Sequence, residues 1–268
     1  MKAASIRSTA MYAYAALLLA FILVPLLIIV PMSLTSGNSL AFPTPGYSTR
    51  WYRELLDDPR WFSSFVNSVV VASAATVFSS LLGIPAAIGL AWGHFPGKKI
   101  VYAIVAAPLV APVVIVGVAA FSFFAAAGMT GNLWALILTH TALAVPVMLT
   151  TVVASLQGFD RTLVRAAASL GAGTMRTFLK VILPLIAPGV LSGAIIAFII
   201  SFDEVVVASF LTTGEQRTLP RMIFSGVRES VSPAIASVAV LLVLFSALLL
   251  GVIAWLQART ARLRARAV

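Results

Sequence analysis

Long apolar runs alternate with short polar segments along the whole chain. Six of these runs reach the length of about 20 residues that a helix needs to cross the hydrocarbon core of a bilayer. They predict transmembrane helices over Met11–Leu34, Ser64–Trp92, Ile100–Ala127, Asn132–Leu156, Leu185–Thr212 and Val231–Gln257. The pattern therefore predicts an all-α integral membrane protein with six transmembrane helices, organised as a single transmembrane domain over residues 1–268.

Composition supports this class independently. Hydrophobic residues make up 61% of the 268 positions, charged residues make up 10%, and the mean hydropathy is +1.06. This hydrophobic content is higher than the core of a soluble protein of this length requires. The first run follows Lys2 and Arg7, as a secretory signal core would, but it is longer than the roughly 7–15 residues of such a core. We therefore expect an uncleaved helix.

The distribution of lysine and arginine predicts the orientation of the chain. With both termini in the cytoplasm, twelve basic residues fall inside and six fall outside, as the positive-inside rule requires. The twelve are Lys2, Arg7, Lys98, Lys99, Arg161, Arg165, Arg176, Lys180, Arg259, Arg262, Arg264 and Arg266. The net charge of +10 thus reflects topology. The basic run 258–268 is explained by attraction to anionic lipid headgroups, and we expect no nucleic-acid partner.

The two longest predicted outside loops each predict a short surface helix. In loop 35–63, Trp51, Tyr52, Leu55 and Leu56 fall on one helical face, with charged residues on the other. Loop 213–230 places mixed charges around an apolar centre. Each helix is explained either by anchoring at the membrane interface or by contact with an external protein.

Prolines and paired glycines recur inside the predicted spans. Each proline removes a backbone hydrogen bond, which predicts kinks around a pathway or reflects the ordinary frequency of proline in membrane helices. These prolines are Pro25, Pro31, Pro85, Pro108, Pro112 and Pro146. The pairs Gly89-x3-Gly93 and Gly189-x3-Gly193 permit close helix packing, inside this chain or against a partner.

A short segment between the fourth and fifth runs predicts a helical elbow. Residues 163–170 and 174–181 each favour a short helix, and Gly171 and Gly173 supply the backbone freedom for a sharp bend between them. The segment is basic, rich in small residues and without catalytic side chains. It is therefore suited to contact with a soluble partner.

The elbow resembles the EAA loop of ABC-importer permeases, whose pattern is E-A-A-x3-G-x9-I-x-L-P. The matching positions within residues 160–184 are Arg165, Ala166, Ala167, Gly171, Val181, Leu183 and Pro184. The resemblance implies that this elbow docks into a cleft on the ATP-hydrolysing subunit. Arg165 stands where the family has Glu, so the contact of that carboxylate does not carry over.

No segment of the sequence carries a catalytic motif. Residues 93–99 approach a phosphate loop, but the glycine spacing is one residue short and Lys99 replaces Ser or Thr. The chain has no cysteine and two histidines, His94 and His140. We therefore expect no enzyme activity, no metal site and no cofactor, with ATP bound by a partner subunit. His140 is interpreted as a hydrogen-bonded packing residue, with a place in a pathway as the alternative.

The pair Asp203-Glu204 lies inside the fifth apolar run, directly after Phe202. A carboxylate at the centre of a membrane helix costs about 2.5–3.5 kcal/mol even on the mild insertion scale, so neither acid is expected to face lipid. Adjacent helical residues diverge by about 100°, which favours one acid lining a pathway and the other pairing with an arginine. In the alternative, both pair with Arg217 or Arg221.

Residues 201–210, followed by Leu219-Pro220 and residues 231–233, resemble the permease subunits of spermidine/putrescine importers. This resemblance implies the type I ABC-importer permease fold in a bacterial inner membrane. It also implies a second permease in a heterodimer, a dimer of ATP-binding subunits and a periplasmic substrate-binding protein. The substrate implied is a cation such as a polyamine, carried along a pathway that includes Phe202, Asp203 and Glu204.

Two alternatives remain open at this stage. Permeases with this general signature also carry opines, 4-aminobutyrate and other amino-acid-like compounds, phosphonates or iron. The second alternative is a proton-coupled secondary transporter that uses Asp203 or Glu204 as a relay. Co-purification of an ATPase separates the importer from the secondary transporter.

Overall fold

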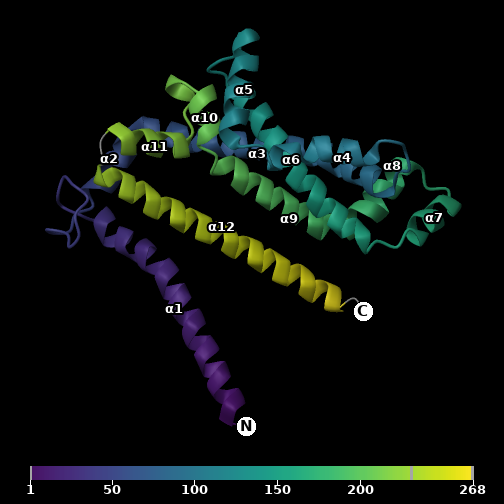
Figure 1. Cartoon of the computed structure of the whole chain (residues 1–268), viewed down its shortest axis with the longest axis horizontal. Coiled ribbons are helices and arrows are strands. Elements are labelled where there is room, and N and C mark those ends of the chain that lie inside the picture. Colours follow the sequence, from purple (N-terminus) through teal and green to yellow (C-terminus); the bar gives the residue numbers. More distant parts are fainter. Residues whose placement is uncertain (1, 230–231, 267–268) are drawn as a thin grey trace. The chain divides into compact units, whose positions relative to one another are not determined.

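Figure 1 shows the computed structural model, which describes residues 2–229 and 232–266. Within these ranges the chain is helical and contains no strand; its one extended pairing is an isolated antiparallel bridge between Thr35 and Tyr47. The chain divides into two compact units, residues 1–59 with 223–268 and residues 60–222. The predicted all-α class is therefore confirmed.

Four of the predicted spans correspond to helices long and apolar enough to cross a membrane. They are α1 (Lys2–Ser33), α3 (Pro59–Trp92), α6 (Leu133–Gln157) and the continuous helical segment Thr174–Phe202. The sixth prediction, Val231–Gln257, corresponds to α12 (Pro233–Arg266), whose apolar part is Pro233–Leu248 among the described residues. Its first position, 231, lies outside the described residues.

The third predicted span, Ile100–Ala127, is wrong as a single straight helix. The chain forms α4 (Lys98–Ala106), a 3₁₀ turn over Ala107–Leu109 and α5 (Val113–Ala126), and the two arms are bent by 98°. Pro108 and Pro112 lie at the bend, where their missing N–H groups and the restriction that Pro112 places on the preceding residue interrupt the helix. Of the prolines in predicted spans, these two break a helix, whereas Pro25, Pro31, Pro85 and Pro146 lie inside helices.

The fifth predicted span, Leu185–Thr212, has different bounds at both ends. The helix begins earlier, at α8 (Thr174–Thr177), and continues through a π-helical turn at Phe178–Ile182 into α9 (Leu183–Phe202). It then stops, and α10 (Val206–Leu211) follows after a short break. Asp203 and Glu204 therefore lie in this break and not inside a helix.

The unit formed by residues 60–222 is organised around the packing of α6 on α9, which run alongside each other in Figure 1. Asn132 begins α6 because its side chain accepts a hydrogen bond from the N–H of Trp134, at 2.9 Å. A Cβ on Gly189 would lie 2.7 Å from Cβ of Ser155, and one on Gly193 would lie 2.9 Å from Sδ of Met148. The Gly189-x3-Gly193 pair thus packs within this chain.

The unit formed by residues 1–59 and 223–268 contains α1, α12 and the predicted surface helix, which is α2 (Arg50–Asp57). Both α1 and α2 contact α12, and the Ser237 hydroxyl donates to the carbonyl of Ser33 at 2.9 Å. Trp51 and Leu55 are buried, whereas Leu56, which was predicted for the same face, is 85% exposed. The other predicted loop helix forms as α11 (Leu219–Glu229).

We predict that Gly189→Ala destabilises the protein by about 1–3 kcal/mol, because the new methyl group would meet Ser155 and the Thr151 carbonyl across a packed interface. The measurement is the Tm of the purified chain in detergent. Gly89→Ala is the matched control, since a Cβ there meets no atom within 4 Å and alanine favours the helix. An equal Tm for the two variants would contradict the packing assigned to Gly189.

Candidate functional site

The elbow predicted from the sequence is present as two short helices. Helix α7 (Thr162–Ser169) ends at a turn in which Gly171 has φ +80°. The N–H of Ala172 donates to the carbonyl of Ala167 at 3.0 Å, and the N–H of Gly171 donates to that of Ala168 at 2.9 Å. This is the Schellman end of a helix, which requires a left-handed residue at the Gly171 position. The prediction of a bend at Gly171 is confirmed.

The beginning of α7 is fixed by Asp160, which the sequence reasoning did not single out. Its carboxylate accepts hydrogen bonds from the Thr162 backbone N–H at 2.8 Å and from the Thr162 hydroxyl at 2.5 Å. These two hydrogen bonds, with a further contribution from the Arg165 charge, lower the pKa of the Asp160 carboxyl below its ordinary value. The elbow thus has a specified start as well as a specified end.

The residues of the EAA-like pattern are distributed along the elbow and do not meet in one cluster. Arg165 and Ala166 are exposed on α7, and Ala167 is half-buried. Val181 lies in the π-helical turn, and Leu183 and Pro184 begin α9. The most exposed large apolar residues of the elbow are Leu170 (89%) and Met175 (69%). The residues of the pattern therefore form an extended surface and not a single cluster.

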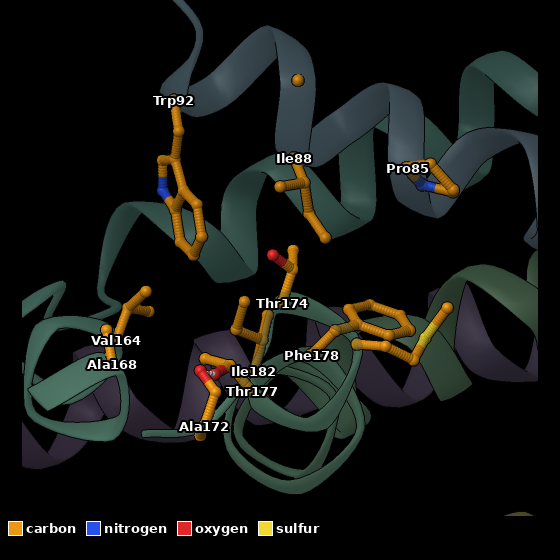
Figure 2. Close-up of a pocket in the computed structure, with 12 residues that line it drawn as sticks. Pro85, Ile88, Trp92, Val164, Ala168, Ala172, Thr174, Thr177, Phe178 and Ile182 are labelled. Atoms are coloured by element: carbon orange, nitrogen blue, oxygen red, sulfur yellow. Dashed lines mark hydrogen bonds between the residues drawn. The ribbon is translucent and has the colours of Figure 1, made fainter. Parts of the chain in front are cut away.

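An apolar cavity of about 800 Å³ lies between the end of α3 and the elbow. Figure 2 shows Ile88 and Trp92 of α3 facing Thr174, Phe178 and Ile182 across it. The Arg161 guanidinium lies 5.2 Å from the centre of the Trp92 ring, and the Phe159 ring packs at 5.3 Å from Trp92. Side chains thus link the end of α3 to the start of the elbow.

The break between α9 and α10, residues 203–205, is called the acidic break and begins where α9 ends at Phe202. Aromatic contacts hold the Phe202 ring. This ring stacks on Phe198 with centroids 5.7 Å apart and meets Phe65 edge-on at 6.4 Å. Asp203 follows and is exposed. Among the residues whose side chains the structure describes, none forms an ion pair or a hydrogen bond with the Asp203 carboxylate.

Glu204 occupies a different environment from its neighbour. Oε1 accepts a hydrogen bond from the N–H of Val206 at 2.9 Å, and Oε2 accepts one from the N–H of Ala208 at 3.2 Å. These N–H groups belong to the first turn of α10, where no carbonyl within the helix is available. The carboxylate therefore caps α10 and complements the positive end of its dipole.

His140 on α6 is the buried partner of this break. Its Nδ1 shares a hydrogen bond with Oγ of Ser201 at 2.8 Å, and its Nε2 lies 3.6 Å from Oε2 of Glu204. The interpretation of His140 as a hydrogen-bonded packing residue is confirmed by the bond to Ser201. Its position beside Glu204 had no sequence signal, because the two residues are far apart in the chain.

The two acids have different environments, as predicted, but the predicted partner is wrong. One acid is exposed and the other is paired, yet Glu204 pairs with His140 and the α10 backbone. Within the described residues, neither Arg217 nor Arg221 forms an ion pair with the acids. Arg221 instead donates to the Thr212 hydroxyl, and the Asn67 amide donates to the Arg217 carbonyl at 3.1 Å.

Comparisons with known proteins give the family. Residues 79–262 match the family described as "Binding-protein-dependent transport system inner membrane component". The putrescine transport system permease protein PotI of Escherichia coli (strain K12) is 34% identical over 258 residues, covering 92% of this chain and 90% of PotI. The spermidine/putrescine transport system permease protein PotC of Haemophilus influenzae is 30% identical over 227 residues, covering 85% of this chain and 88% of PotC.

The fold agrees with this assignment. A crystal structure of a bacterial ABC transporter that imports the acidic polysaccharide alginate contains a chain similar to this one, with a TM-score of 0.75 and 16% identity. The similarity covers 94% of this chain and 97% of that chain. The chain belongs to the inner-membrane permeases of binding-protein-dependent transport systems. It is a multi-pass membrane protein that works with ATPase and substrate-binding components.

We predict that Gly171→Val loosens the end of α7 and lowers the amount of ATPase that co-purifies with the permease. A β-branched residue at φ +80° is strained whatever space surrounds it. The measurements are amide hydrogen exchange over residues 167–173 and the ratio of ATPase to permease after purification. Gly173→Val is the control, because Gly173 has φ −68° and open space around its Cα. Equal exchange in both variants would contradict a specific need for glycine at position 171.

Proposed function

We propose that this chain carries a di- or polyamine across a bacterial inner membrane, as one of two related permease subunits of an ABC importer. The observation that carries the proposal is the exposed carboxylate of Asp203 in the break between α9 and α10, without a cationic partner among the described side chains. The polyamine substrates named for PotI and PotC support the same substrate class.

The surroundings of Asp203 suit a primary ammonium group. A carboxylate in a pathway of reduced dielectric attracts a cation more strongly than it does in water. Phe202 directly precedes Asp203 in the chain, and its ring packs against those of Phe198 and Phe65; aromatic faces attract ammonium groups by cation–π contact. One exposed acid is also a compromise between attracting the substrate and releasing it.

In this proposal, the elbow couples the ATP-binding subunit to the membrane helices. Residues 160–184 dock on the ATP-binding subunit, with Ala166 and Ala167 permitting close approach and Gly171 setting the bend. ATP is bound by that subunit, and this chain needs no cofactor of its own. Closure of the ATPase pair would move the docked elbow and switch the helices between inward-open and outward-open arrangements as a rigid-body transition.

The complete assembly that we propose contains this chain, a second permease, two ATP-binding subunits and a periplasmic substrate-binding protein. The positive-inside distribution supports cytoplasmic termini and an elbow on the cytoplasmic side. In that orientation, α11 and the loop before it face the periplasm, where the binding protein delivers substrate.

Competition for uptake by the intact assembly tests the substrate class. Putrescine and spermidine are expected to compete with a labelled diamine, whereas 4-aminobutyrate, opines, aminoethylphosphonate and ferric iron are not. Competition by a phosphonate without competition by either amine would overturn the polyamine proposal. Uptake that persists without the ATP-binding subunit would favour the secondary transporter.

We predict that Asp203→Asn reduces uptake of putrescine by about tenfold or more, which corresponds to about 1.4 kcal/mol of lost interaction with the cation. Capture of putrescine by the binding protein is expected to be unchanged, because that step occurs on another polypeptide. Asp57→Asn is the control, since it makes the same change of side chain and charge at an exposed position at the end of α2. Normal uptake by a correctly assembled Asp203→Asn complex would contradict a pathway role for this acid.

We predict that Arg165→Glu weakens assembly with the ATP-binding subunit. Because Arg165 is exposed on α7 and occupies the position of the family's glutamate, the facing ATPase surface is expected to present an acidic group. The measurement is the ATPase-to-permease ratio as a function of salt, with Arg165→Gln separating loss of charge from reversal of charge. Stronger assembly of the Glu variant would show that the facing surface is basic.

A further inference from the structure

We infer that His140 is a positioning residue for transport: its buried imidazole holds Glu204, and through Glu204 it holds the break that presents Asp203. The inference rests on the proposed function of Asp203. It assigns a transport role to a side chain of α6 that does not itself touch the pathway acid.

The end of α9 at Phe202 is not marked by glycine or proline in the sequence. Helices usually stop at glycine or before proline, and residues 199–206, Ile-Ile-Ser-Phe-Asp-Glu-Val-Val, contain neither. The common stop signals are therefore absent from this segment. The break is stabilised instead by side-chain contacts, one of them local and the other with α6.

Glu204 provides the first of these contacts. In a continuous helix, the N–H groups of Val206 and Ala208 would bond to carbonyls one turn earlier. Here the carboxylate oxygens of Glu204 accept both hydrogen bonds, at 2.9 and 3.2 Å. The side chain thus replaces the carbonyl partners that the interruption removes. Losing it would leave two amide groups unsatisfied in an apolar setting, which is costly.

His140 provides the second contact and fixes where the carboxylate lies. The Glu204 side chain is only 9% exposed, and the His140 side chain is fully buried. Nε2 lies 3.6 Å from Oε2 and has no hydrogen-bond partner among the described residues, so Glu204 is the polar group that it faces. The Ser201 hydroxyl holds the other ring nitrogen at 2.8 Å and so fixes the plane of the ring.

The consequence for Asp203 follows from its position between two anchored residues. Phe202 is held by its aromatic neighbours, and Glu204 is held by His140 and α10. The backbone of Asp203 is therefore fixed on both sides, and its exposed carboxylate is presented in one direction. If the break closed into a helix, the direction of the Asp203 side chain would change with it. A packing role alone for His140 would give no such link between the two residues.

A double-mutant cycle tests this link in the reconstituted importer, with its ATP-binding and substrate-binding subunits and labelled putrescine. The variants are His140→Leu, Asp203→Asn and their combination. We expect His140→Leu to reduce uptake by about tenfold and the double variant to be no slower than Asp203→Asn alone, since a positioning residue has nothing left to position. His140→Gln, which keeps an N–H near the place of Nε2, is expected to restore uptake to within about threefold of the original rate.

Amide hydrogen exchange provides a readout that does not depend on transport. His140→Leu should accelerate exchange at Val206 and Ala208, and His140→Gln should reverse the change. His94→Leu is the matched control, because His94 is the other histidine of the chain and lies in the loop between α3 and α4. If His140→Leu does not assemble, Ser201→Ala, which removes only the contact at Nδ1, takes its place in both measurements.

Three outcomes would overturn the inference in different ways. Unchanged exchange at Val206 and Ala208 would show that His140 does not hold the break. Losses of uptake that multiply in the double variant would show that His140 acts independently of Asp203. Normal uptake by Asp203→Asn with accelerated exchange in His140→Leu would locate the failure in the proposed function, and the transport role of His140 would fall with it.

Discussion

The backbone of this protein must satisfy its N–H and C=O groups internally wherever it lies in the hydrocarbon core. Helices meet this requirement without help from other segments, which explains why most of the described chain is helical. Each interruption of a helix leaves backbone N–H and C=O groups that need other hydrogen-bond partners. At the bend between α4 and α5, the prolines reduce the number of unpaired groups because they have no N–H. At the break after α9, a glutamate carboxylate takes the place of the missing carbonyls.

The elbow and the acidic break are stabilised in different ways. The elbow is encoded locally, by Asp160 at the start of α7 and by a left-handed glycine at its end. Such a device needs little from the rest of the fold and can be exposed to a partner. The acidic break combines a local cap, from Glu204 to the first turn of α10, with tertiary contacts to α6, and its conformation therefore also depends on how α6 and α9 are packed. A movement of those helices during transport would be transmitted to Asp203 directly.

The register of α6 on α9 links close packing to the acidic break. Met148 contacts the position of Gly193, and His140 contacts Ser201. His140 lies eight residues before Met148 on α6, and Ser201 lies eight residues after Gly193 on α9. A single antiparallel register of the two helices therefore accounts for both contacts. The glycines let the two backbones approach, and this approach brings the His140 ring within hydrogen-bond distance of Ser201. Close packing at Gly189 and Gly193 thus supports the contact between His140 and Ser201.

The sequence alone was sufficient for features that local chemistry determines. Apolar runs gave the class and most of the spans, and the spacing around Gly171 gave the elbow with its bend at the right residue. The different environments of Asp203 and Glu204 were also predicted, although from adjacent positions on a helix, whereas the two acids lie in the break between α9 and α10. The angle between α4 and α5 and the termination of α9 at Phe202 were not. Only the tertiary structure decided that His140, and no arginine, faces Glu204, because that contact depends on the register of two helices whose interacting residues are distant in sequence.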